Sequence, residues 1–219
     1  MKQPPLRTPD RLDVPMARRQ TLRNGVELHT LPDDEFEVLR LSFVFRAGSA
    51  VQRVPFSASS TANLLSEGSR DMDAQQIAEK LDFYGSYYDV NVDRDYVYLS
   101  FCSLSKFFLP TLEVAERILL GPVFPEDEVD AYRRKRKQRL AIERLKVDTK
   151  AREALAQALF GERHPYGISY NEAAYDTLTR EDLADMYRTH YTAGNCLAVC
   201  SGNITDAHLQ AIVALAERL

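Results

Sequence analysis

The four histidines are the first residues to consider as catalytic groups, because zinc hydrolysis needs about three protein ligands and an open position for water. Two of these ligands are usually histidines one helical turn apart, joined by a carboxylate or a third histidine. In this sequence of 219 residues no two histidines lie three or four positions apart, and neither His-Glu-x-x-His nor His-x-x-Glu-His occurs. The residues alone therefore predict no zinc site. The histidines are His29, His164, His190 and His208.

The three cysteines do not form a disulfide framework either. Cys196 and Cys200 lie in one strand-like run, so their Cα atoms are expected roughly 13 Å apart, which is too far for a disulfide. Cys102 lies in another apolar run. We interpret all three as small buried thiols of a reducing compartment, which predicts a cytoplasmic protein.

Nucleophilic and phosphate-binding chemistry have no support in the sequence. Ser57, Ser59, Ser60 and Ser66 are clustered, but no Gly-x-Ser-x-Gly motif surrounds them. Small hydroxyl side chains on a helix are more often packing residues than nucleophiles. The glycines form no phosphate-binding loop.

The strongest charge run is RRKRKQR, over Arg133–Arg139. Nucleic-acid binding through this run is one alternative function. A basic domain and interleaved aromatic residues would support it, whereas this chain has a net charge of −4 and the predicted helix also carries acidic residues. We therefore favour a solvated helix face, and we expect neither a nucleic-acid partner nor a membrane partner.

The elements that would position any site alternate between strands and helices. Asn24-Gly25 predicts the turn of a strand hairpin over 19–31. Leu39, Leu41, Phe43 and Phe45 alternate along a strand over 38–45. Capping residues and terminal glycines mark the helices. We expect helices over 57–67, 73–84, 109–120, 125–160 (bending near 148–149), 179–187 and 205–219, and strands over 87–92, 96–102 and 195–201.

This order predicts a single α+β domain over residues 19–219. It would contain one mixed, mostly antiparallel sheet with helices packed on one face. Residues 1–18, with Pro4, Pro5, Pro9 and Pro15, are expected to form an extended arm rather than a secretory signal. No stretch approaches the roughly 18 consecutive apolar residues that a membrane span needs.

A set of short motifs resembles the pitrilysin/insulinase zinc peptidases, which include the mitochondrial processing peptidases. Each motif is weak alone, but the set follows the order and spacing of that family from about residue 19 to 219. Members carry two such domains in one chain or pair two chains, so the resemblance implies the first half of a longer two-repeat protein. The motifs are Leu22-Arg23-Asn24-Gly25, Phe45-Arg46-Ala47-Gly48-Ser49, Gly68-Ser69 with the helix over 74–85, Asp95, Pro122-x-Phe124-Pro125, Phe160-Gly161-x-x-His164-Pro165-Tyr166-Gly167 and Gly202-Asn203-Ile204.

The sequence departs from the family at its zinc motif. The resemblance implies His-x-x-Glu-His on the helix before Gly68, where this chain has Ser59, Ala62 and Asn63 at the three functional positions. Glu143, which follows Asn63 by 80 positions, is the candidate for the family's distal glutamate ligand. One carboxylate without its histidines does not hold zinc. The resemblance therefore implies no catalytic residue, no metal and no other cofactor in this chain, with zinc present only in a motif-bearing partner.

The implied function is that of a non-catalytic peptidase homologue. Its partner would be a second peptidase-like repeat or a zinc-bearing homologous subunit, and the pair would handle peptides. Active relatives bind a peptide as an added strand, and the matching stretch here is Asp89-Val90-Asn91-Val92. The same stretch equally fits an ordinary strand edge. A second alternative is an active zinc metallopeptidase with ligands from Glu143, His164 or another domain.

Overall fold

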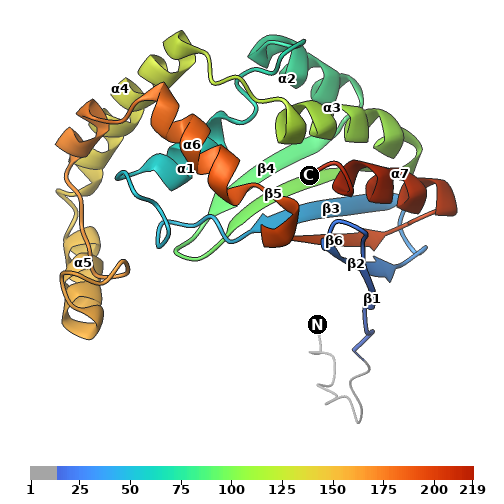
Figure 1. The fold of residues 1–219 in the computed structure, drawn as a ribbon, viewed down its shortest axis with the longest axis horizontal. Coiled ribbons are helices and arrows are strands. Elements are labelled where there is room, and N and C mark those ends of the chain that lie inside the picture. Colours follow the sequence, from blue (N-terminus) through green and yellow to red (C-terminus); the bar gives the residue numbers. More distant parts are fainter. Residues whose placement is uncertain (1–13) are drawn as a thin grey trace, which may run out of the picture.

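One six-stranded mixed sheet and seven helices make up the computed structural model, which describes residues 14–219 (Figure 1). The predicted arm over 1–18 lies mostly outside the described residues, and 14–17 belong to no helix or strand. The strands are β1 Arg18–Thr21, β2 Glu27–Pro32, β3 Val38–Phe45, β4 Tyr87–Val92, β5 Val97–Leu104 and β6 Cys196–Gly202. The helices are α1 Ser57–Leu64, α2 Ala74–Phe83, α3 Phe108–Leu120, α4 Glu126–Glu143, α5 Val147–Phe160, α6 Arg180–His190 and α7 Asp206–Ala216.

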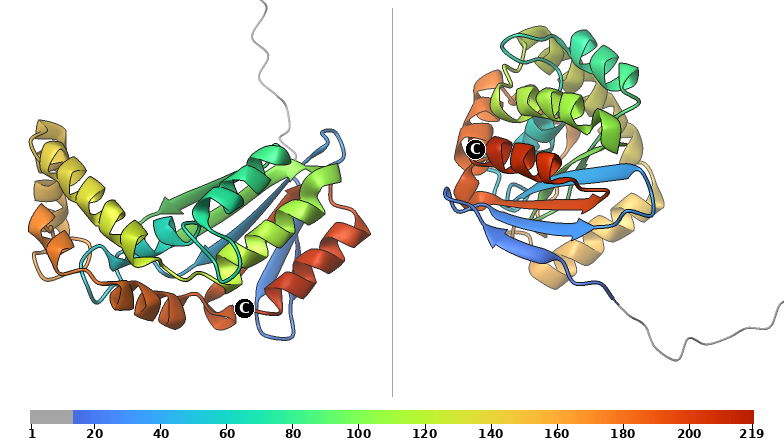
Figure 2. Two further views of the ribbon diagram at one scale, coloured as in Figure 1. Left: turned by 90° about the horizontal axis from the view of Figure 1, so that it is seen from above. Right: turned by 90° about the vertical axis from the view of Figure 1, so that its right-hand side faces the viewer.

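The sheet has the order β1-β2-β6-β3-β5-β4. Strands β2 and β6 are parallel, and every other neighbouring pair is antiparallel. Helices α2, α3 and α7 cover one face of the sheet, as the two views of Figure 2 show. The structure thus confirms the predicted α+β fold with one mixed, mostly antiparallel sheet.

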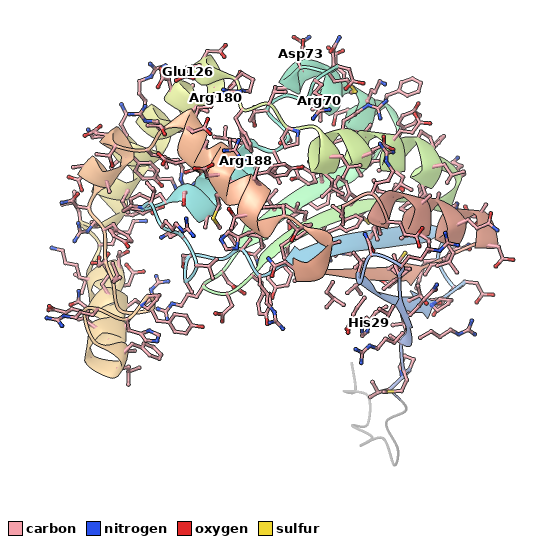
Figure 3. All side chains as sticks on the ribbon, viewed as in Figure 1. His29, Arg70, Asp73, Glu126, Arg180 and Arg188 are labelled. Atoms are coloured by element: carbon pink, nitrogen blue, oxygen red, sulfur yellow. The ribbon has the colours of Figure 1, made fainter. Side chains whose placement is uncertain are left out.

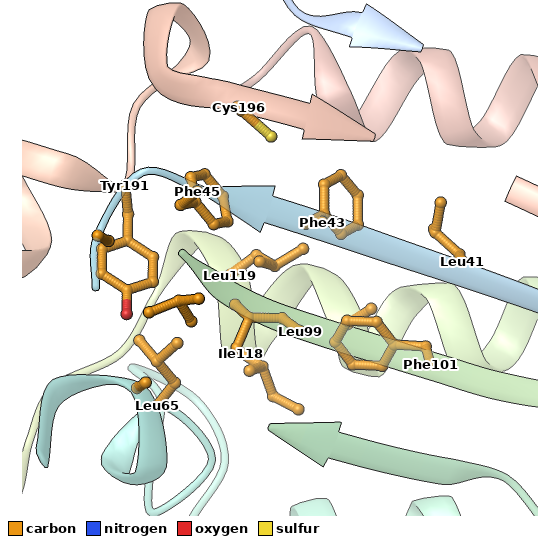
Figure 4. Packing of buried hydrophobic residues seen from close by; sticks show 14 of the residues in the cluster. Leu41, Phe43, Phe45, Leu65, Leu99, Phe101, Ile118, Leu119, Tyr191 and Cys196 are labelled. Atoms are coloured by element: carbon orange, nitrogen blue, oxygen red, sulfur yellow. The ribbon is translucent and has the colours of Figure 1, made fainter. Parts of the chain in front are cut away.

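The core lies between this sheet face and its helices. Leu39, Leu41, Phe43 and Phe45 alternate along β3, and all four are fully buried, as their spacing predicted. They pack with Leu99 and Phe101 of β5 and with Ile118 and Leu119 of α3 in one continuous cluster (Figure 4). Burying a large apolar side chain contributes about 1.5–3 kcal/mol, so this row holds β3 at the centre of the sheet.

Local signals in the sequence predicted most element boundaries. Asp73, Thr179 and Thr205 each form a capping box with the residue three positions later, at the starts of α2, α6 and α7. Gly25 adopts a φ of 91° in the β1–β2 turn, a conformation that glycine accepts without steric cost. The helices predicted over 57–67 and 205–219 end earlier, at residues 64 and 216.

The helix predicted over 125–160 is wrong in one respect. Instead of one helix that bends near 148–149, the chain forms two helices: α4 ends at Glu143 and α5 begins at Val147. Lys146 has an extended backbone, with a ψ of 137°, and Asp148 falls in the first turn of α5. No glycine or proline marks the break, which is why the sequence pattern did not reveal it.

Candidate functional site

Helix α1 is the element on which the resemblance places the lost zinc motif. Its open side carries Ser59 and Asn63, whereas Ala62 is fully buried. Ser59 Oγ donates a hydrogen bond to the Phe56 carbonyl at 3.2 Å, and Asn63 Nδ2 donates to the Ser59 carbonyl at 2.7 Å. Both polar side chains are therefore satisfied by backbone carbonyls in or beside the helix, and none of the three residues offers a histidine nitrogen or a carboxylate to a metal.

A cavity of about 600 Å³ opens between α1, the end of α4 and α5. Ser59 and Glu143 both line it, so the first degenerate position and the candidate distal ligand share one site. The Glu143 side chain is 36% exposed, and its Oε1 accepts a hydrogen bond from Arg139 Nε at 2.7 Å. A ligand role for Glu143 stays a prediction, because in this structure its carboxylate already has a cationic partner.

One wall of the cavity is formed by the β4–β5 hairpin and by the loop after α5. The Arg94 guanidinium lies over the ring of Tyr166 at 5.1 Å and over that of Phe160 at 5.7 Å. The Tyr166 hydroxyl donates to the Asp95 carboxylate, and this contact raises the pKa of Tyr166. Residues of two family-like motifs, far apart in the sequence, thus meet at this wall.

The opposite wall is charged and comes from the start of α5. Lys146, Asp148, Arg152 and Glu153 line the cavity there. Arg152 donates to Asp148 and lowers the pKa of that carboxyl, while Glu153 lies 3.6 Å from a guanidinium nitrogen of Arg144. Sequence reasoning missed these residues because it continued α4 through them, and nothing in the pattern indicated that they face α1.

The donors near α1 do not fit zinc. Within residues 14–219 no group of three or more His, Cys, Asp and Glu side chains forms that could hold a metal ion. His164 stacks on Phe160 with ring centroids 5.4 Å apart, and His29 lies on β2, across the molecule from α1 (Figure 3). Burial raises the pKa of the Cys196 and Cys200 thiols to about 12, so neither is a thiolate near neutral pH.

The predicted peptide-binding stretch lies at an edge of the sheet. Strand β4 contains Asp89, Val90, Asn91 and Val92, and among the described residues it pairs only with β5. Beyond its last residue the chain reaches the cavity at Arg94. Its first residues border a second groove of about 530 Å³, shared with α2 and with Glu67, whose pKa burial raises. The β4 edge therefore connects two hollows on the surface.

The basic run Arg133–Arg139 lies on α4 and is partly used inside the fold. Arg133 Nε donates to the Tyr175 carbonyl at 2.9 Å, and Lys137 Nζ lies 2.6 Å from the Asp176 carboxylate. These contacts tie α4 to the turn over 172–176, which supports the structural interpretation of the run. In the described part of the chain, no helix has both the length and the apolar character needed to cross a membrane.

Comparisons with solved structures agree on one fold. No protein-family model and no curated protein matches the sequence. Among solved structures, the peptidase M16 inactive domain from Pseudomonas fluorescens superposes with a TM-score of 0.87 at 21% identity, over 93% of this chain and 50% of that one. A protein described as an M16-like peptidase, from Alicyclobacillus acidocaldarius, superposes with a TM-score of 0.81 at 18% identity, over 95% of this chain and 51% of that one. The first half of the periplasmic protease PqqL from Escherichia coli superposes with a TM-score of 0.77 at 15% identity, over 92% of this chain and 46% of that one.

The chain spans about half the length of the solved structures that it matches. Peptidase M16 is the family of the pitrilysin and insulinase enzymes, so the likeness agrees with the motifs found in the sequence. The assignment of Ser59, Ala62 and Asn63 to the zinc motif rests on the resemblance in sequence and stays a prediction. This chain has the fold of a peptidase M16 half-domain.

Proposed function

We propose that this chain is a non-catalytic half of a zinc-peptidase assembly. The observation that carries the proposal is the cavity beside α1 in a domain with the M16 fold, because it is lined by Glu143 and by Ser59, which the resemblance assigns to a zinc-ligand position. A domain with this fold and without ligands contributes walls and binding surface rather than chemistry. The zinc and the attacking water would then belong to a homologous repeat or subunit that carries His-x-x-Glu-His.

Purification of the full-length protein from its source tests this function. We expect a related polypeptide with an intact zinc motif to co-purify, and we expect peptide hydrolysis and zinc to follow that polypeptide. The measurement is peptidase activity and metal content of the complex and of each separated component. Isolation of a stable monomer with neither such a partner nor a zinc-bearing second repeat would contradict the proposal. Stoichiometric zinc in this chain that Glu143→Ala removes would favour the alternative of an active metallopeptidase.

Peptide capture along β4 is the binding role that we propose for this half. An edge strand presents unpaired N–H and C=O groups that accept an extended peptide, and the grooves at both ends of β4 leave space for its side chains. The β4 edge would then align a peptide past α1. The edge position of β4 and the two hollows support this role.

Amide hydrogen exchange tests the β4 edge directly. Addition of an unstructured, valine- and threonine-rich peptide to the complex is expected to slow the exchange of alternate β4 amides by about tenfold or more, because an added strand would accept their hydrogen bonds. The matched control is β1, which forms the opposite edge of the same sheet and, within residues 14–219, pairs only with β2. Equal protection at β1 and β4, or none at β4, would count against peptide capture there.

A further inference from the structure

Helix α5 carries its apolar side chains on the side that faces solvent. At 100° per residue, six apolar residues fall within an arc of about 140°. The large ones are strongly exposed, with Val147 at 82%, Leu155 at 59% and Leu159 at 68%. The alanines between them are exposed as well. We call this surface the α5 stripe, formed by Val147, Ala151, Ala154, Leu155, Ala158 and Leu159.

The other side of α5 is largely polar although it faces the protein. Thr149, Arg152 and Glu153 line the cavity beside α1, and Ala156 is the one residue of α5 that is buried. This is the reverse of an ordinary surface helix, which buries its apolar face. The α5 stripe is thus not explained by packing within the described part of the chain.

The apolar surface continues in the sequence before α5. Ile142 and Leu145, at the α4–α5 junction, are 62% and 76% exposed. Figures 1 and 2 show α5 at the end of the molecule away from β1 and β2, and its packing on other elements is sparse. Contiguous exposed apolar surface of this kind marks an interaction site more often than a free surface.

Shape and charge indicate what covers the stripe. Three of its six residues are alanines, Ala151, Ala154 and Ala158, and small residues let another helix approach closely. Lipid-binding helices instead rely on large aromatic and aliphatic side chains, and the stripe has no aromatic residue. Residues 131–163 hold eleven Lys and Arg against four Asp and Glu, in a chain whose net charge is −4. Two copies of this basic segment would repel each other, whereas an acidic partner would be attracted.

We propose that the α5 stripe is the docking site for an apolar helix with acidic margins on a partner polypeptide. Lys150, which borders the stripe beside Ala154 and has no ion pair within the described structure, would face the acidic residues of that helix. One helix face alone is smaller than the about 1,200 Å² that a stable interface buries, so the partner also covers Ile142 and Leu145. This inference rests on the proposed function, because it identifies the helix with the zinc-bearing partner.

Two variants of the full-length protein, each expressed from its natural locus, test the inference. Leu155→Glu is expected to lower the yield of the co-purified partner by about tenfold or more, because it places a charge within the apolar stripe. Phe83→Glu is the matched control, since Phe83 is 82% exposed on α2, and it should leave the yield unchanged. The melting temperature of both isolated variants should stay close to that of the parent, because both side chains are exposed.

A photo-crosslinking residue at position 155 identifies the occupant. An adduct with an acidic-margined helix of a His-x-x-Glu-His polypeptide would support both the stripe and the proposed function. An adduct with a polypeptide of another fold would support the docking site and overturn the proposed function. An undiminished yield of the zinc-bearing partner with Leu155→Glu would overturn the docking site alone. Two other results would also overturn the proposed docking site. One is a crosslink to a second copy of this chain, and the other is Leu155-dependent binding to phosphatidylglycerol vesicles.

Discussion

Replacing Gly48 by alanine is expected to lower the free energy of unfolding by about 2–4 kcal/mol, a large part of the about 5–15 kcal/mol that holds a domain together. A Cβ at this position would lie 2.5 Å from the carbonyl carbon and oxygen of Arg94 and 2.6 Å from the carbonyl carbon of Asp95. These are backbone atoms of the β4–β5 hairpin, so no side-chain rotation relieves the clash.

The close contact between Gly48 and the β4–β5 hairpin also brings together the partners of three backbone hydrogen bonds. The N–H groups of Gly48, Ser49 and Ala50 donate to carbonyls of residues 93–95 at 2.7–3.1 Å. Moving the hairpin to admit a methyl group would lengthen all three, and it would shift Arg94 and Ser49, which line the cavity beside α1. We therefore expect the loss of stability to be accompanied by weaker peptide binding by the assembly.

Urea denaturation monitored by circular dichroism measures this effect. Gly194→Ala is the matched control, because a Cβ there meets no atom within 4 Å and the backbone is not in the left-handed region. The control should change the unfolding free energy by less than about 0.5 kcal/mol. Equal midpoints for the two variants would show that the hairpin accommodates a side chain and that Gly48 is not required by packing.

Gly48 also shows why the family-like motifs could be found in the sequence but not explained by it. Several motif residues make contacts over long sequence separations. Tyr166 donates to Asp95, and a Cβ at Gly68 would lie 3.1 Å from the Pro125 ring. Hydrophobic alternation and helix capping involve residues a few positions apart, so the sequence predicts the alternation of β3 and the helix caps at Asp73, Thr179 and Thr205. The reasons for the scattered glycines and aromatics became visible only in three dimensions.

The candidate site was predictable to a similar extent. Counting back from Gly68 assigns the zinc-motif positions to residues of α1, and this assignment stays a prediction. The structure shows that Ser59 and Glu143 line one cavity. The charged wall of α5 was not predictable, because the break after Glu143 has no glycine or proline signal. The α5 stripe was hidden for a related reason. An apolar face in a sequence predicts burial within the chain, and it does not distinguish a core from a docking surface.

The second prediction is that two histidines restore zinc binding to α1. Positions 59 and 63 are one helical turn apart on the open side of the helix, so the double variant Ser59→His/Asn63→His places two imidazoles toward one point. Ala62 is left unchanged, because it is fully buried and a glutamate there would carry an uncompensated charge into the core. We expect one zinc per chain, with an affinity at least about tenfold higher than that of either single variant.

The identity of the third ligand decides how far the M16 geometry has been kept. Glu143→Gln in the double variant is expected to weaken zinc binding by about tenfold or more, because it removes the carboxylate that shares the cavity with position 59. Glu153→Gln is the matched control, as Glu153 lines the same cavity and also has an arginine partner. Competition with a chromophoric chelator measures both affinities.

The outcomes show whether the backbone around α1 and α4 still has the geometry of a metal site. Zinc binding that depends on Glu143 would mean that only the side chains of the motif have been lost and that the backbone still presents a metal site. Dependence on Glu153 instead would show that the distal ligand position, 80 residues after Asn63, has been assigned wrongly. No zinc binding by the double variant would mean that α1 and the end of α4 no longer converge as they do in a metallopeptidase. The cavity would then be a surface shaped for peptide or partner contact alone.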